Sequence, residues 1–167
     1  MIIEEQSLTT ADWSREQKRS LQWHPSRSLL RAIRFYQSAR GPFAGLIRRS
    51  AIERHRFWSI VTGADIPVDC QLGGGLMLPH PNGVVIAPGA VIGVNCIIFQ
   101  QVTIGTHDGG YPTIGDGVFI GAGAKVLGPI CIGNGAKIGA NAVVMVDVAA
   151  GATAVGIPAS VRLAYPD

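Results

Sequence analysis

Two histidines of this chain stand where they could act on a bound hydroxyl group. His80 and His107 both lie in the glycine-rich second part of the sequence, and each lies beside a short insertion in an otherwise regular repeat. Histidine has a usual pKa close to neutral pH, so its ring can take a proton from a hydroxyl that is protonated at that pH. His80 is therefore a candidate for general acid–base chemistry, against the alternative that it is an ordinary surface histidine at a corner of the repeat.

The other reactive side chains argue against several kinds of site. The cysteines are odd in number and form no cluster with histidine, which disfavours a disulfide framework and a zinc site; they are Cys70, Cys96 and Cys131. A metal-dependent solenoid enzyme of the carbonic-anhydrase type needs three spaced histidines around one metal, and the second part of the chain has two. No motif of a nucleophilic serine or cysteine is visible, so a covalent acyl-enzyme is disfavoured. We expect no metal cofactor.

From about residue 64 onward the sequence repeats itself every six residues. An aliphatic residue, often followed by Gly, recurs with this period, and a small or β-branched residue comes four positions after it. This period fits neither an α-helix nor an alternating strand, but it fits a solenoid in which three units of strand and corner close one coil of about 18 residues. The aliphatic positions are Ile86, Ile92, Ile98, Ile104, Ile114, Ile120, Val126, Ile132, Ile138 and Val144. The repeat predicts that these side chains point inward, and that Gly or Asn at a corner is chosen for its backbone angles.

Two insertions interrupt the repeat. The first adds two residues around 81–83, directly after His80, and the second adds four within 106–111, around His107. Loops that leave a rigid scaffold are where binding and catalysis usually occur. The insertions therefore mark the expected functional region.

The first part of the chain has a different character. We expect residues 1–63 to form a helical region, with helices near 28–39 and 43–61, and residues 64–167 to form the solenoid with its C-terminal tail. Thr10 or Asp12 is a candidate cap for one helix start, and Ser26 is a candidate cap for another. Residues 1–62 hold eleven of the fourteen Lys and Arg against five acids. The simpler interpretation is a set of helices packed on the solenoid with a solvated basic face. The alternative is that these helices also touch an anionic membrane surface. We expect no nucleic-acid partner.

Four segments of the repeat resemble a known family. The segments GLMLPH (75–80), GDGVFIGAGAKVLG (115–128), IGANAVV (138–144) and GIPA (156–159) are similar to the bacterial serine O-acetyltransferase branch of the hexapeptide-repeat acyltransferases. The resemblance is best over residues 64–163, and the short N-terminal part resembles members that occur with surface-polysaccharide biosynthesis. It implies a mainly β fold, namely a left-handed parallel β-helix after a short α-helical region. It also implies a homotrimer with active sites between subunits, and transfer of acetyl from acetyl-CoA to a hydroxyl.

The resemblance also implies roles for particular residues. His80 matches the general base, and Asp65, fifteen residues upstream, matches the carboxylate that orients it. The arm of acetyl-CoA would run past small residues, and its phosphates would lie near a lysine, with Lys137 as first and Lys125 as second candidate. The small positions are Gly105, Thr106, Ala122, Gly123 and Ala140.

The sequence departs from the family pattern at the acceptor site. Pro79 stands where serine acetyltransferases usually have Asp, and Tyr111 lies where Arg-His usually ends the second insertion. The family uses those charges to hold the ammonium and carboxylate of an amino acid, and a neutral sugar needs none of them. We therefore expect a sugar hydroxyl of surface-polysaccharide biosynthesis as acceptor, with Pro79, His107 and Tyr111 as acceptor-binding candidates. The alternative is serine O-acetylation in cysteine biosynthesis, and a lesser alternative is a non-catalytic hexapeptide scaffold.

The expected location is the cytoplasm. Free thiols suit a reducing compartment, and the acidic start of the chain does not resemble a signal peptide. If the basic helices contact lipid, that location narrows to the inner face of the membrane.

Overall fold

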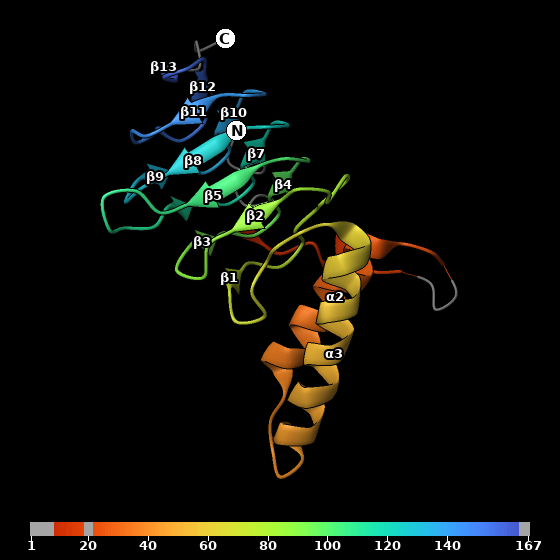
Figure 1. Ribbon diagram of the computed structural model, residues 1–167. Coiled ribbons are helices and arrows are strands. Elements are labelled where there is room, and N and C mark those ends of the chain that lie inside the picture. Colours follow the sequence, from red (N-terminus) through yellow and green to blue (C-terminus); the bar gives the residue numbers. More distant parts are fainter. Residues whose placement is uncertain (1–8, 19–21, 164–167) are drawn as a thin grey trace.

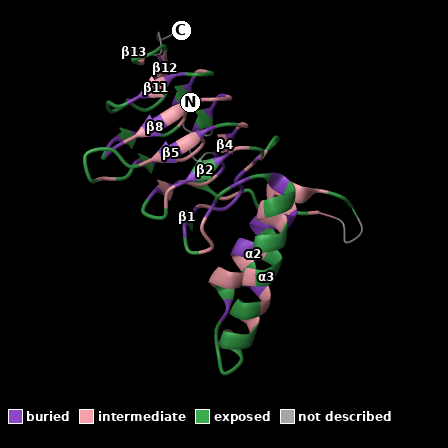
Figure 2. Cartoon of the chain, viewed as in Figure 1, coloured by how far each residue is buried: buried purple, intermediate pink, exposed green. Residues whose placement is uncertain are grey.

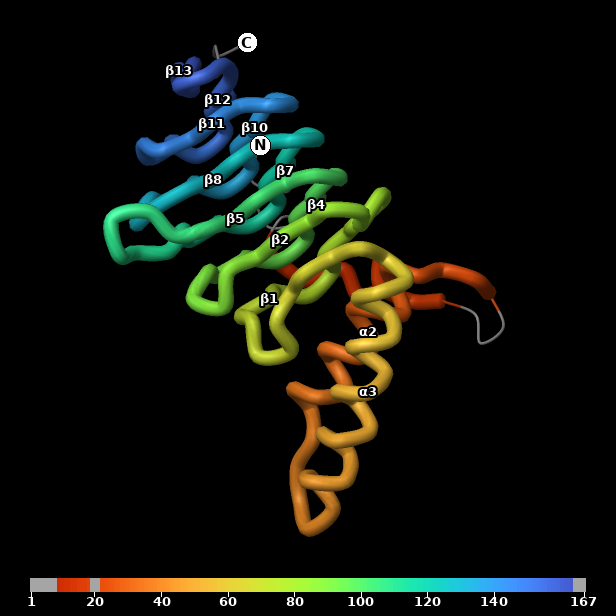
Figure 3. The backbone as a smooth tube through the Cα atoms, in the orientation of Figure 1, coloured from red at the N-terminus to blue at the C-terminus, as the bar shows by residue number. Residues whose placement is uncertain are grey.

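The computed structural model describes residues 9–18 and 22–163. A short 3-10 helix, η1 (Trp13–Glu16), is followed by the helices α2 (Pro25–Ser38) and α3 (Ala44–Thr62) and then only by short strands. The strands stack into a tapering column, and α2 and α3 project from its first end as an antiparallel hairpin (Figures 1 and 3). None of the helices in the described ranges is long and apolar enough to cross a bilayer.

The strands form three sheets, one for each face of the column. Face 1 holds β2 (Val85–Ile86), β5 (Thr103–Gly105), β8 (Lys125–Leu127) and β11 (Val143–Val144). Face 2 holds β1 (Gln71–Leu72), β3 (Val91–Ile92), β6 (Thr113–Ile114) and β9 (Cys131–Ile132). Face 3 holds β4 (Ile97–Ile98), β7 (Phe119–Ile120), β10 (Lys137–Ile138), β12 (Thr153–Val155) and β13 (Ser160–Arg162). All pairings between these named strands are parallel except that of β13, which folds back antiparallel on β12.

The predicted inward positions form the core. In each two-residue strand on the solenoid the second residue is buried and the first is not, so the buried residues stack from coil to coil (Figure 2). Ile98, Ile104 and Ile120 are fully buried. Burial of one such side chain stabilises the fold by roughly 1.5–3 kcal/mol. Cys70 and Cys96 also point inward, as the repeat predicts.

Glycine is needed for two separate reasons, of which the repeat predicted one. Gly123, three positions after an aliphatic residue, has φ +75°, and Asn141 occupies the equivalent place with φ 56°. Gly93, directly after an aliphatic residue, is required by close approach instead, because a Cβ there would lie 2.5 Å from the carbonyl carbon of Gly115 in the next coil.

The register confirms both insertions and places them on different edges. Asp65 pairs with Val85, Val85 with Thr103, and Thr103 with Lys125. The first and the third coil, which contain the two insertions, are therefore each longer than the second. Residues 81–83 lie at the edge between faces 3 and 1, called here the 3–1 edge. Residues 106–111 lie at the edge between faces 1 and 2, called the 1–2 edge. This separation decides how the site can form.

The helices close the first end of the solenoid. Leu29, Leu30 and Ile33 of α2 are buried in the same core cluster as the first coil. The guanidinium of Arg34 donates to the carbonyl oxygens of the first coil and pairs with Glu16 at 2.8 Å. The basic helices therefore pack on the solenoid, which both interpretations of this region require.

Details of the helix ends correct the sequence-based expectation. The helix expected at 28–39 begins earlier, at Pro25, because Pro fits the first turn, where the missing N–H is not needed. His24, and not Ser26, is its N-cap, without a side-chain hydrogen bond. Asp12 does cap η1, since its carboxylate accepts from the N–H of Ser14 at 3.0 Å. The end of α3 is fixed by Gly63 in the left-handed conformation.

Candidate active site

His80 is exposed at the 3–1 edge, directly before the first insertion. Its ring centroid lies 6.4 Å from that of Phe99, which in turn lies 5.3 Å from that of Phe119. Within the described residues its ring makes no hydrogen bond or ion pair. The imidazole therefore has both nitrogens available, with an aromatic surface on one side.

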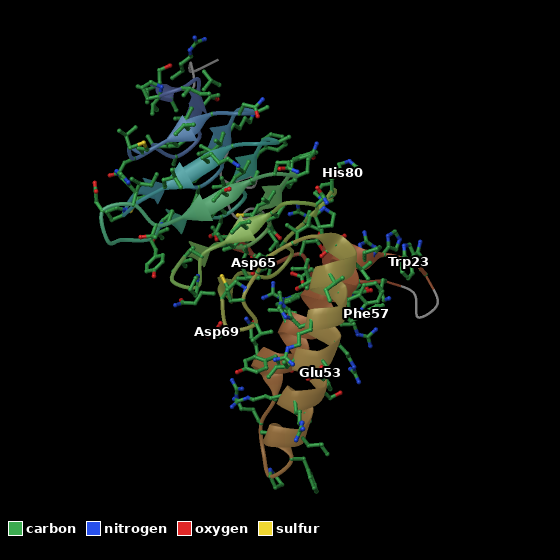
Figure 4. All side chains as sticks on the ribbon, viewed as in Figure 1. Trp23, Glu53, Phe57, Asp65, Asp69 and His80 are labelled. Carbon is green, nitrogen blue, oxygen red and sulfur yellow. The ribbon has the colours of Figure 1, made fainter. Side chains whose placement is uncertain are left out.

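Asp65, the expected partner of His80, is not bonded to it. The backbone of Asp65 pairs with the second coil, its N–H donating to Val84 O at 2.8 Å and its carbonyl accepting from Ile86 at 2.9 Å. The carboxylate is exposed and has no hydrogen bond to His80 in the described part of the chain. Figure 4 shows the two labelled side chains at separate places on the first coils. The orienting role of Asp65 stays a prediction.

Small residues continue the 3–1 edge beyond His80. Ala122 and Gly123 form its corner in the third coil, and Ala140 stands at the corner of the fourth. Backbone hydrogen bonds join these corners, from Asn141 N–H to Ala122 O at 2.8 Å and from Gly123 N–H to Gln100 O at 2.9 Å. Because Ala122, Gly123 and Ala140 carry no side chain larger than a methyl group, an extended ligand can approach the backbone closely at these three residues, as the predicted acetyl-CoA arm requires.

The two solenoid lysines have different environments. The Lys125 ammonium donates to Gln101 O at 2.7 Å and to Thr103 Oγ1 at 3.1 Å, so it ties its coil to the preceding one. Lys137 is exposed and has no hydrogen bond or ion pair among the described residues; in the register it stacks on Phe119. Lys137 is thus the better candidate for a phosphate contact, in the order that the sequence suggested.

The remaining predicted residues gather at the 1–2 edge. Gly105 ends β5, Thr106 follows it, and in the next loop His107 Nε2 lies 3.2 Å from Asp108 Oδ2. Tyr111 closes the loop, half-exposed, with its ring over Gly89, where an added Cβ would lie 2.4 Å from Tyr111 Cδ2. These groups face away from the edge that carries His80.

The predicted site is therefore split across two edges of one chain. His80, Pro79 and the small corner residues lie at the 3–1 edge, whereas Thr106, His107 and Tyr111 lie at the 1–2 edge. In a single rigid column the two groups do not meet. A cyclic assembly, which sets one edge of a subunit against the other edge of its neighbour, would bring them together.

Sequence reasoning missed three residues near His80. Phe99 and Phe119 form the aromatic surface at the 3–1 edge, and Phe99 occupies a position where the repeat often has Gly, which is a signal that could have marked it. Gln100 carries a buried Oε1 that has no hydrogen-bond partner among the described residues. Buried polar atoms are nearly always bonded, so Gln100 is a candidate for contact with a ligand or another subunit.

The cysteines do not join this chemistry. Burial raises the pKa of the Cys70 and Cys96 thiols to about 11, which keeps both protonated at neutral pH. Cys131 is exposed. In the described ranges no group of three or more His, Cys, Asp or Glu side chains is arranged to hold a metal ion.

Comparison with known proteins gives consistent matches. The family model "Bacterial transferase hexapeptide (six repeats)" matches residues 111–145. A serine acetyltransferase of Helicobacter pylori is 41% identical over 123 residues, covering 65% of this chain and 72% of that protein. The chain spans about half the length, or somewhat less, of the first curated relatives it matches, all serine acetyltransferases or probable ones.

Solved structures match the fold as well. The soybean serine acetyltransferase complexed with serine has a TM-score of 0.75 and 36% identity, covering 93% of this chain and 68% of that one. A serine acetyltransferase in complex with CoA has a TM-score of 0.72 and 34% identity, covering 84% of this chain and 58% of that one. The predicted fold, a left-handed parallel β-helix preceded by helices, is confirmed.

Proposed function

Because the chain belongs to the serine acetyltransferase family, we propose that it transfers an acetyl group from acetyl-CoA to the hydroxyl of L-serine. The observation that carries the proposal is His80, which is exposed and makes no side-chain hydrogen bond to any described residue, at an edge that continues as small residues suited to the arm of acetyl-CoA. The names of the relatives favour serine over the sugar acceptor that Pro79 and Tyr111 suggested. One relative is solved with serine and another with CoA.

The reaction proceeds by direct transfer. His80 takes the proton of the acceptor hydroxyl while its oxygen attacks the thioester carbonyl carbon. The tetrahedral oxyanion collapses, the carbon–sulfur bond breaks, and the CoA thiolate takes the proton from the imidazolium. A backbone N–H that faces the oxyanion lowers the barrier by a few kcal/mol. The proposal needs no acyl-enzyme, in accord with the high pKa of the buried thiols.

The complete site requires a second copy of the chain. The 3–1 edge supplies His80, the adjoining face 3 supplies Lys137, and the 1–2 edge of a neighbour supplies Gly105, Thr106 and the loop that ends at Tyr111. A homotrimer with three such sites satisfies this geometry. In this loop the Asp108 carboxylate can accept hydrogen bonds from the ammonium of serine and the His107 ring, 3.2 Å from Asp108 Oδ2, can donate to its carboxylate, in place of the family's own charged residues.

A second candidate is acetylation of a sugar hydroxyl. The observation in its favour is that Pro79 replaces a charge beside His80, while the half-exposed Tyr111 ring offers a stacking surface for a sugar. The serine proposal depends instead on His107 and Asp108.

One acceptor panel separates these candidates. CoA release from acetyl-CoA is measured with L-serine, with neutral sugars and with nucleotide-sugars. Turnover with L-serine that falls in the variant Asp108→Asn, but not in Tyr111→Leu, supports the serine proposal. Turnover only with sugars, lost in Tyr111→Leu and kept in Asp108→Asn, replaces it with the second candidate. Failure to release CoA with any acceptor, together with no binding of acetyl-CoA, would favour the non-catalytic scaffold.

A further inference from the structure

We propose that one face of the helical hairpin docks on a bilayer that contains anionic phospholipid. This face, called the aromatic–basic face, consists of Trp23, Arg31, Phe35, Arg54, Phe57 and Trp58. It lies on α2, α3 and the segment directly before α2, and none of its six residues belongs to the proposed active site. The proposal is therefore independent of which acceptor the enzyme uses.

The aromatic–basic face is a single connected surface. The Trp23 and Trp58 ring centroids are 5.5 Å apart, and those of Phe57 and Trp58 are 5.0 Å apart. The Arg54 guanidinium lies 5.2 Å from the ring centroid of Phe35, which joins α3 to α2. Figure 4 shows the labelled Trp23 and Phe57 on the same side of the hairpin.

Its charge suits an anionic phosphate. Residues 22–62 contain eight arginines and one acid, Glu53, which is already paired with Arg56 at 3.2 Å. Arg31 and Arg54 line a cavity of about 220 Å³ together with Lys18, and no carboxylate lines it. The Lys18 ammonium also lies 5.7 Å from the Trp58 ring centroid. Cations beside aromatic rings, open to solvent, form a site that a phosphate headgroup fits.

The apolar side chains around the cavity favour a bilayer over other anions. Trp23 is 69% exposed, Phe57 is 54% exposed, and Ile60, one turn after Phe57, is 84% exposed. A small phosphate ligand would leave these side chains in water, whereas the interface of a bilayer accommodates aromatic and aliphatic groups next to basic ones. A second copy docked on the same face would bring like charges together, and a nucleic acid offers no place for Ile60.

Vesicle sedimentation with the whole chain tests the docking. Vesicles of phosphatidylcholine with phosphatidylglycerol should bind the protein, and vesicles of phosphatidylcholine alone should bind it far more weakly. Arg31→Ala with Arg54→Ala should weaken binding roughly twenty-five-fold, because each basic residue near an anionic surface contributes about a fivefold factor. The conservative pair Arg31→Lys with Arg54→Lys should retain binding, which shows that a loss comes from charge and not from misfolding.

A matched control and the other occupants complete the test. Arg40→Ala with Arg162→Ala removes the same charge from exposed residues that are not part of this face, and it should weaken binding less than the first pair does. Phe57→Ser should also weaken vesicle binding. Equal losses in both arginine pairs, or binding to heparin but to neither vesicle, would overturn the proposal in favour of a general polyanion surface. If the wild type forms a larger oligomer that dissociates only in the variant Arg31→Ala with Arg54→Ala, the proposal is overturned in favour of self-association. Acetyl transfer in solution should be unchanged in all these variants.

Discussion

Subunit complementation follows directly from the division of the predicted site between two edges. His80→Ala removes the proposed base from the 3–1 edge, and Thr106→Trp fills the place at the 1–2 edge where the acetyl-CoA arm is expected. Thr106 is exposed, so the larger ring has room without disturbing the core. Each variant alone should lose at least about 99% of activity, since general base catalysis commonly contributes 10²–10⁴-fold. A mixture of the two should recover activity.

The size of the recovery follows from cyclic symmetry. Each site takes its 3–1 edge from one subunit and its 1–2 edge from the neighbour. It is intact only when the first subunit carries Thr106→Trp and the second carries His80→Ala. In trimers assembled at random from equal amounts, about one quarter of the sites meet this condition. The mixture should therefore reach about a quarter of the wild-type rate per site.

The assay is CoA release after the two variants are unfolded and refolded together. Two controls belong with it: the same variants combined without refolding, and His80→Ala refolded with the double variant His80→Ala, Thr106→Trp, which has no intact 3–1 edge and should stay inactive. If the refolded mixture is no more active than its components, the site does not form between the two edges, and the reasoning from the split site is wrong.

Three further predictions concern the phosphate contact, the core and the thiols. Lys137→Ala should raise the KM for acetyl-CoA by roughly two- to fivefold with little change in kcat, since an exposed ion pair contributes at most about 1 kcal/mol. Steady-state kinetics measure both constants, and an unchanged KM would show that Lys137 does not contact the phosphates. Ile104→Ala should lower the free energy of unfolding by about 2–5 kcal/mol, because its side chain is fully buried and stacks on the next coil; urea denaturation measures this, and a loss well under 1 kcal/mol would contradict the packing. At pH 8 a disulfide reagent should modify the exposed Cys131 first and should react slowly with Cys70 and Cys96, whose pKa values are raised to about 11. The reaction of Cys70 and Cys96 should become faster as the pH rises toward that value. Equal rates for all three thiols at pH 8 would contradict this prediction.

The repeat predicted the core because each inward position has the same local environment in every coil. Ile98, Ile104 and Ile120 occupy equivalent places, and the six-residue period alone identifies them. The insertions were also visible, since they change the distance between aliphatic residues.

Properties that depend on the neighbouring coil were not visible. Lys125 and Lys137 occupy the same position of the repeat, yet Lys125 has Gln101 and Thr103 as neighbours one coil away, whereas Lys137 has Phe119. These neighbours are 18 to 24 residues away in sequence, and they decide whether the ammonium finds a hydrogen-bond acceptor among the described residues. The division between Gly93, needed for close approach, and Gly123, needed for positive φ, likewise appears only when the coils are stacked.

The central claim is that His80 is the base of a direct acetyl transfer, and one comparison tests it. Acetyl-CoA consumption with L-serine is measured for the wild type and for His80→Ala, with binding of acetyl-CoA measured in parallel. The account predicts that His80→Ala loses at least about 100-fold in kcat while its affinity for acetyl-CoA is unchanged. A His80→Ala variant that turns over at the wild-type rate would contradict the claim.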